Sequence, residues 1–174
     1  MATGILPIAV GEATKCISFL QNKKKKYFFT IKWGESTETD DSQGKVIEKS
    51  KNRPTEDQIL KIISSFLGDI LQKPPIYSAI KINGQRSYKL ARQNLLVEHN
   101  SRKVKIHKLI LKKIFNIDTA QFEVVCSKGT YVRSLAKDIA EKLKTKGHIT
   151  ELRRLSVGNF VIKDTIFMDF SKEI

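Results

Sequence analysis

The strongest constraint on the fold is a series of short strand-like segments joined by turns, with few helical segments between them. Residues 27–37, YFFTIKWGEST, are rich in aromatic and β-branched residues, and a turn-like TDDSQG separates them from a second such segment at residues 45–49. Alternating apolar residues predict two more strands at 102–111 and 120–127. The short turns favour a mixed α/β domain of the α+β type, in which helices flank a largely antiparallel sheet.

Helical periodicity is confined to a few segments. Residues 54–69 carry a capping-box pattern at Thr55, an apolar face and a terminal glycine, which together predict a helix. A second apolar stripe at helical spacing follows Arg133. Residues 87–94 predict a short helix for which Ser87 is the expected cap.

Charge and cysteine content limit the classes of function. The 174 residues suit one compact domain, and 32 Lys and Arg against 18 Asp and Glu leave a net charge of +14. This excess favours a polyanionic partner, although a Lys-rich solubilising surface would have the same composition. Cys16, Cys126 and three scattered histidines have no metal-ligand spacing, so we expect neither a metal nor a disulfide. The apolar stretch 5–10 is too short to span a bilayer, and we expect a soluble, cytoplasmic protein without a membrane partner.

Two basic segments have a chemical signature. In CSKGTYVRSLAKDIAEKL, a glycine turn places Tyr131 and Arg133 at the entry to a helix, where an arginine faces the positive end of the helix dipole. A nearby carboxylate or phosphate would make that position favourable. In ELRRLSVGNF, Arg153 and Arg154 are expected on opposite sides of an extended chain.

Five blocks, in order and over nearly the whole chain, resemble the TruB family of bacterial tRNA pseudouridine synthases. They are GILPIAVGEATK, KKYFFTIKWGESTETDDSQG, PPIYSAIKINGQRSYKLAR, CSKGTYVRSLAKDIAEKL and HITELRRLSVGNF. The resemblance implies the pseudouridine synthase catalytic fold and the isomerisation of uridine 55, in the tRNA T-loop, to pseudouridine. It implies no cofactor, the T-arm of tRNA as partner, and a monomer. The target base must leave its stack to react, at a cost of a few kcal/mol.

The resemblance also implies roles for four residues. Tyr27 would stack on the target uracil and assist removal of the C5 proton, and Tyr131 would hydrogen-bond the flipped nucleotide. Arg133 would pair with the family's catalytic aspartate and keep it ionised. Leu152 would form an apolar wall against the base. Each has a plainer alternative: a strand aromatic, a turn brace, a surface ion pair and a core leucine, respectively.

The family's catalytic aspartate falls outside the printed sequence. The family motif reads LDPLATG, and aligning its last three letters with residues 2–4 puts the aspartate before residue 1. We therefore expect residues 1–174 to be a partial catalytic domain without the family's PUA domain, and to be inactive alone. Asp40 and Asp41 belong to a turn, where local backbone hydrogen bonding explains them. The alternative is a catalytically inactive, basic RNA-binding remnant of the same family. The lysine run 23–26 is expected to be a solvated face, with non-specific contacts to tRNA phosphates as the other interpretation.

Overall fold

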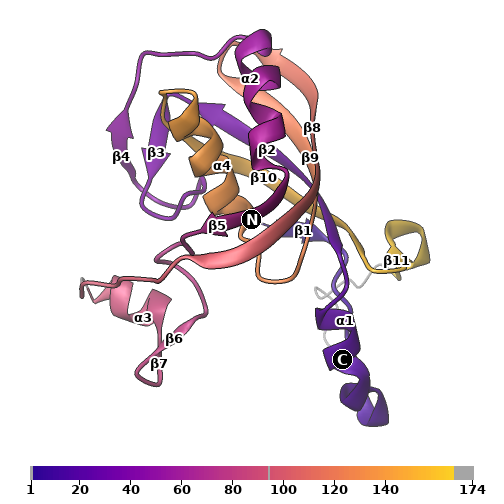
Figure 1. Cartoon of the computed structure of the whole chain (residues 1–174). Helices are drawn as coiled ribbons and strands as arrows, with labels where there is room; N and C mark the ends of the chain where they lie inside the picture. The colour runs from indigo at the N-terminus through magenta and orange to yellow at the C-terminus, as the bar shows by residue number, and fades with distance from the viewer. Residues whose placement is uncertain (1, 94, 167–174) are drawn as a thin grey trace.

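One central sheet organises the chain. The computed structural model describes residues 2–93 and 95–166, and within them seven strands form a sheet in the order β1-β10-β2-β9-β8-β5, with β11 beside β10 (Figure 1). These strands are β1 (Ala2–Gly4), β2 (Lys25–Trp33), β5 (Gly68–Gln72), β8 (Arg102–Asn116), β9 (Thr119–Cys126), β10 (Gly147–Val157) and β11 (Phe160–Val161). All pairs are antiparallel except β1 with β10. The mixed, largely antiparallel fold is confirmed.

Two small hairpins lie outside this sheet. They are β3 (Glu35–Thr37) with β4 (Val46–Lys49), and β6 (Lys81–Ile82) with β7 (Gln85–Arg86). Gly34 has φ +91° and separates β2 from β3, so the strand expected over 27–37 is two strands. Asn83 and Gly84, with φ values of 48° and 83°, make the tight turn of the second hairpin.

The described residues contain four helices, and three of them lie where helices were predicted. The four are α1 (Ile17–Gln21), α2 (Glu56–Ile63), α3 (Ser87–Arg92) and α4 (Val132–Lys142), and 3-10 turns cover Gly11–Cys16, Ser64–Phe66 and Ile162–Asp164. The helix expected over residues 54–69 ends at Ile63, and Gly68 and Asp69 begin a strand. The capping box is present, with the Gln58 amide 3.3 Å from Thr55 Oγ1. The expectation that Ser87 caps α3 is wrong. The N-cap is Arg86, and the buried Ser87 hydroxyl instead donates to the carbonyl of Ile76.

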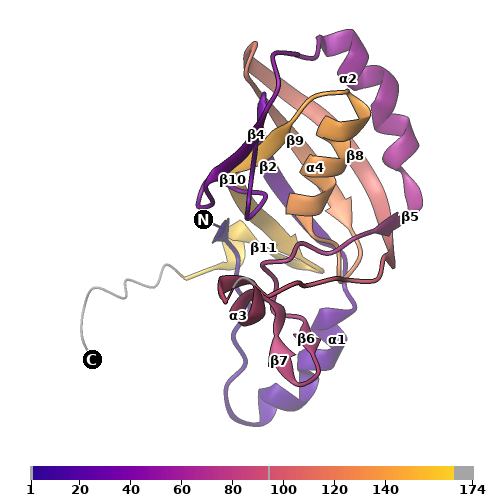
Figure 2. The same cartoon turned by 90° about the vertical axis from the view of Figure 1, so that its left-hand side faces the viewer.

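The core lies between one face of the sheet and the helices α2 and α4 (Figure 2). Phe29, Ile31 and Trp33 alternate along β2 and point to this face, as the period of a strand requires. The Phe29 and Phe122 rings stack with centroids 5.3 Å apart. Leu135 of α4 is fully buried against them.

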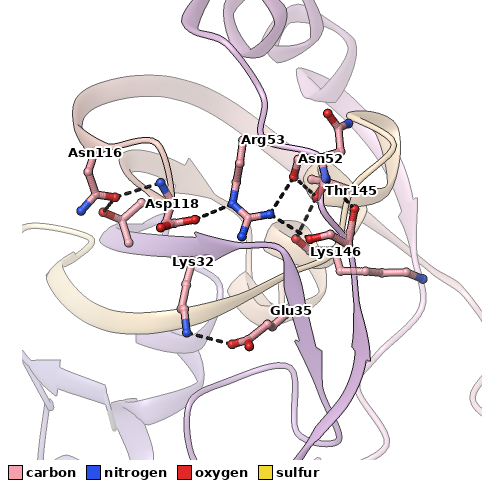
Figure 3. A network of polar contacts seen from close by, with 10 residues as sticks. Lys32, Glu35, Asn52, Arg53, Asn116, Asp118, Thr145 and Lys146 are labelled. Carbon is pink, nitrogen blue, oxygen red and sulfur yellow. Dashed lines mark hydrogen bonds and ion pairs between the residues drawn. The ribbon is translucent and has the colours of Figure 1, made fainter.

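A polar network closes the end of the sheet at Trp33 and Gly147 (Figure 3). Arg53 forms an ion pair with Asp118 in the β8–β9 turn and donates to the carbonyl of Ser50. Thr145 donates to the carbonyl of Asn52 at 2.8 Å. These contacts tie three turns together and account for this group of polar residues structurally.

Two segments extend from the opposite end. The lobe of α3, β6 and β7, and the segment that contains α1, both project beyond the sheet there (Figures 1 and 2). Across the described part of the chain, each helix is too short or too polar to cross a bilayer.

Candidate active site

All four site residues expected from the resemblance line one hollow of about 360 Å³, called here the Tyr27 hollow. Its lining consists of Ala2, Tyr27, Asp41, Gln43, Thr130, Tyr131, Val132, Arg133 and Leu152. These residues come from β1, β2, β10, the start of α4 and two connecting turns. The structure thus brings together positions that lie more than a hundred residues apart in the sequence.

Strand register places Tyr27 and Leu152 on the same face. In the β2–β10 pair, Tyr27 is opposite Arg154 and Phe29 is opposite Leu152. Opposed residues of an antiparallel pair point to the same side of the sheet. Tyr27 and Leu152 are half-buried and pack against the core cluster from its rim. Tyr27 and Leu152 therefore form the apolar part of the lining of the hollow, at the edge of the core between the sheet and the helices.

The start of α4 is anchored to the end of β5. Tyr131 is the N-cap residue of α4, and its amide donates to Gln72 Oε1 at 2.8 Å. Ser134 Oγ donates to the carbonyl of Lys73 at 2.8 Å. Both contacts fix the first turn of α4, and with it the position of Tyr131 and Arg133 beside the hollow.

The Arg133 guanidinium joins three segments of the chain. It donates to the carbonyl of Thr39 at 2.9 Å, to Asp41 Oδ2 at 3.2 Å and to the carbonyl of Tyr77 at 2.8 Å. The Asp41 carboxylate supplies the anion that the start of α4 was expected to require. This arginine is therefore held in one orientation by the turn at residues 39–41 and by the segment that leads into the α3 lobe.

Asp41 is the site residue that sequence reasoning did not select. The expected local bonding is present, because Oδ1 accepts from Thr39 Oγ1 at 2.6 Å and from the Gln43 amide at 3.0 Å. Its other oxygen reaches Arg133, and the two side chains are 7% and 22% exposed, respectively. The unfavourable place of an arginine at a helix start was the signal that could have identified this partner.

Burial raises the pKa of Tyr27, and the hydrogen-bonding and charge effects of Arg154 act in the opposite direction. The ordinary pKa of a tyrosine is already about 10. Tyr27 is therefore a neutral phenol at neutral pH, suited to stacking and hydrogen bonding. Within residues 2–93 and 95–166, the structure groups no three His, Cys, Asp or Glu side chains that could hold a metal ion.

Comparison with known families identifies the chain. Residues 1–132 match the model of the TruB family pseudouridylate synthase N-terminal domain, and residues 133–172 match that of the tRNA pseudouridylate synthase B C-terminal domain. The chain belongs to the TruB family. The family resemblance of its sequence blocks is thereby confirmed.

Individual TruB-family relatives align along almost the whole chain. The tRNA pseudouridine synthase B of Bradyrhizobium diazoefficiens is 50% identical over 97% of this chain and 49% of its own length. The proteins of the same name from Agrobacterium fabrum and Caulobacter sp. are 49% and 44% identical, over 51% and 54% of their lengths. The chain spans about half the length of the curated relatives it matches.

Solved structures share the fold. A chain of "Crystal Structure of a Cbf5-Nop10-Gar1 Complex" has a TM-score of 0.67 at 26% identity, over 92% of this chain and 38% of that one. A chain of "Structure of H/ACA RNP bound to a substrate RNA containing 2'-deoxyuridine" has a TM-score of 0.63 at 23% identity, over 92% and 36%. The second likeness concerns the fold alone.

Proposed function

We propose that this TruB-family chain binds the target uridine within a tRNA pseudouridine synthase that converts uridine 55 of the T-loop to pseudouridine. The observation that carries the proposal is the convergence of Tyr27, Tyr131, Arg133 and Leu152 on one hollow. In this reaction the bond from ribose to N1 breaks, the uracil turns in the pocket, and ribose bonds to C5. The proton lost from C5 is balanced by one gained at N1. The chain needs only to bind, orient and exchange protons with the nucleotide.

In this proposal the hollow holds the flipped base. Tyr27 stacks on the uracil, and stacking of this kind contributes about 1–3 kcal/mol per base. Leu152 closes the pocket on the side of β10, and Tyr131 hydrogen-bonds the nucleotide from the start of α4. Because burial raises the pKa of Tyr27, the side chain is a neutral phenol, and its hydroxyl orients a water molecule that accepts the C5 proton.

Arg133 is a positioning and charge-stabilising group in this scheme. The Asp41 carboxylate has both oxygens engaged, by Arg133 on one side and by Thr39 and Gln43 on the other. A carboxylate held in this way is poorly placed to attack ribose, since displacement of even an ångström can cost about 10²-fold in rate. We propose that Asp41 holds Arg133 in place and that the nucleophile is the aspartate of the family motif LDPLATG. Ala2 lines the hollow, so the first described residues lie next to the reacting nucleotide.

The wider setting is proposed on the same basis. A net charge of +14 and the TruB relatives favour the T-arm of a tRNA as the partner, bound by a monomer in the cytoplasm. Residues 1–174 would form the part of the catalytic domain that holds the target nucleotide. No step in the scheme calls for a metal or an organic cofactor.

The test uses an unmodified tRNA transcript labelled with tritium at C5 of uridine, which loses the label when pseudouridine forms. Two proteins are compared: the 174-residue chain, and the same chain with the family's Leu-Asp-Pro-Leu segment in place of Met1, directly ahead of Ala2. The extended protein should release label from position 55, and Arg133→Leu in that protein should abolish release. Turnover by the 174-residue chain would contradict the placement of the nucleophile. Tight tRNA binding without turnover by the extended protein would favour the RNA-binding remnant.

A further inference from the structure

A second hollow adjoins the Tyr27 hollow and is called here the Lys25 hollow. It measures about 490 Å³, and Lys25, Lys128, Gly129 and Arg154 line it together with apolar residues such as Leu20. Its lining contains three cationic side chains and no aspartate or glutamate. Such a concentration of one charge in a concave site attracts an anion.

The partners of the three cations within residues 2–93 and 95–166 are neutral groups. Lys25 Nζ donates to the carbonyl of Lys23 at 2.8 Å, Lys128 Nζ to Asn22 Oδ1 at 2.6 Å, and Arg154 Nε to the carbonyl of Ile5 at 2.7 Å. In the described part of the chain, no carboxylate forms an ion pair with any of the three. Their positive charge is therefore not paired with any carboxylate of the described residues.

Mutual repulsion is already felt at Lys25. Burial lowers the pKa of Lys25, and the positive charges of Arg154 and Lys128 lower it further. The next residue, Lys26, differs, since its Nζ lies 3.1 Å from Glu123 Oε2. Lys26 is thus paired with a carboxylate, whereas its neighbour Lys25 lies among other cations. Of these two lysines, Lys25 is the one available to bind an anionic ligand.

The Lys25 hollow and the Tyr27 hollow are lined by neighbouring residues of the same segments. Lys25 and Tyr27 are two positions apart on the same face of β2, which is about 7 Å along a strand. Arg154 lies opposite Tyr27 on β10, and residues 128–131 pass from one hollow to the other. Gly129, at φ +79°, has no atom within 4 Å of the position a Cβ would take, so its backbone is open to close approach.

We propose that Lys25, Lys128 and Arg154 bind a backbone phosphate of the RNA strand next to the flipped nucleotide. The inference rests on the proposed function, because it assumes that the target base occupies the Tyr27 hollow. It adds a phosphodiester subsite that fixes the strand while the uracil turns. A contact of this kind positions the RNA without reading its sequence.

Salt dependence of binding measures the subsite directly. The 174-residue chain is titrated with a T-arm stem-loop RNA at several salt concentrations. The double variant Lys25→Gln/Lys128→Gln should flatten the slope of log K against log salt by about 0.7 for one lost contact to a single-stranded phosphate. The control is Lys112→Gln, an exposed lysine of β8 outside both hollows, which should change the slope much less.

A second arm needs no protein variant. One methylphosphonate, which carries no charge, replaces in turn each of the two phosphates that flank the target uridine. One of these RNAs should bind the unaltered chain roughly 10-fold more weakly, as expected for loss of charge-assisted hydrogen bonds. The double variant should bind that RNA and the all-phosphate RNA with nearly equal affinity.

Three results would overturn the subsite. Equal loss of affinity by the unaltered chain and the double variant at both linkages would place the phosphate elsewhere. A slope change for Lys112→Gln as large as for the double variant would mean that the slope reflects the net charge of the protein and not a specific phosphate contact. If the unaltered chain binds no T-arm RNA, the proposed function fails and the subsite fails with it, whereas either of the first two results leaves the proposed function standing.

Discussion

Arg133 and Arg154 lie beside adjoining hollows, yet their surroundings are opposite. Arg133 has a carboxylate partner, Asp41, and two carbonyl acceptors, and it is bound before any ligand arrives. Arg154 shares its hollow with two lysines and has no carboxylate partner in the described residues. A cation paired in this way orients other groups, while an unpaired one is available to an external anion. The difference separates the positioning part of the site from the part proposed to bind phosphate.

The largest effect should come from removing the paired arginine. Arg133→Met leaves the Asp41 carboxylate buried without its cation, which we expect to lower the free energy of unfolding by about 3 kcal/mol. Arg154→Met leaves no buried carboxylate behind and should cost about 1 kcal/mol. Urea denaturation of both variants measures the difference. Equal losses would remove the distinction between the two arginines.

Gly4 lies between Ala2, which lines the Tyr27 hollow, and Leu6, which lines the Lys25 hollow. Its φ is +94°, and an added Cβ would lie 2.2 Å from the carbonyl oxygen of Arg154. Gly4→Ala should therefore separate β1 from β10 and cost about 2 kcal/mol. Hydrogen exchange at the Ile5 amide, which donates to that carbonyl at 3.0 Å, should accelerate. Unchanged protection there would show that β1 is not held as described.

A half-buried acid on α4, Asp138, gives a pH-dependent effect. Burial, with a smaller contribution from Glu141, raises the pKa of Asp138 from 3.8 to about 6. Ionised Asp138 thus disfavours the folded state, and stability is lost as the pH rises from the unfolded-state pKa through the folded-state pKa. Asp138→Asn should be more stable than the unaltered chain by about 2 kcal/mol at pH 7, since the partial exposure of the side chain reduces the full effect of the raised pKa. The gain should vanish near pH 4, and a gain independent of pH would point to another cause.

The smallest effect should be purely structural. Thr55→Ala removes the capping box of α2, far from both hollows, and should cost about 1 kcal/mol in thermal or urea unfolding. RNA affinity should stay unchanged under conditions where the variant is folded. A change in affinity equal to that of Lys25→Gln/Lys128→Gln would mean that stability alone controls binding.

Much of this arrangement could be predicted from local sequence. The alternation along β2, β8 and β9, the capping box of α2 and the apolar stripe of α4 are local signals, and each predicted an element of the right type. The bounds were less accurate, because β2 ends at Trp33 and α2 ends at Ile63, earlier than expected. The strands β1 and β5 are short and pair with distant segments, so no local pattern indicated them. Ser87 was misassigned because its hydroxyl serves a buried contact with Ile76 and not the helix end.

The site divides in the same way. Tyr27, Tyr131, Arg133 and Leu152 were located by the family motifs, and the structure places them together. The Asp41–Arg133 pair joins residues 92 positions apart. The sequence of the acidic turn predicted only the local hydrogen bonds of Asp41 and not its ion pair with Arg133. The Lys25 hollow was equally hidden, because the lysine run does not reveal that Lys25 and Lys26 face opposite sides of β2.

The central claim is that the Tyr27 hollow receives the target base, and an abasic RNA tests it most directly. Affinities of the 174-residue chain, Tyr27→Ala and the control Phe28→Ala are measured for a T-arm stem-loop with uridine, or no base, at the target position. Phe28 is the neighbour of Tyr27 on the opposite face of β2. Tyr27→Ala should weaken binding of the uridine RNA by about 10-fold or more, and of the abasic RNA hardly at all. Equal weakening of both RNAs, or the same pattern for Phe28→Ala, would contradict the account.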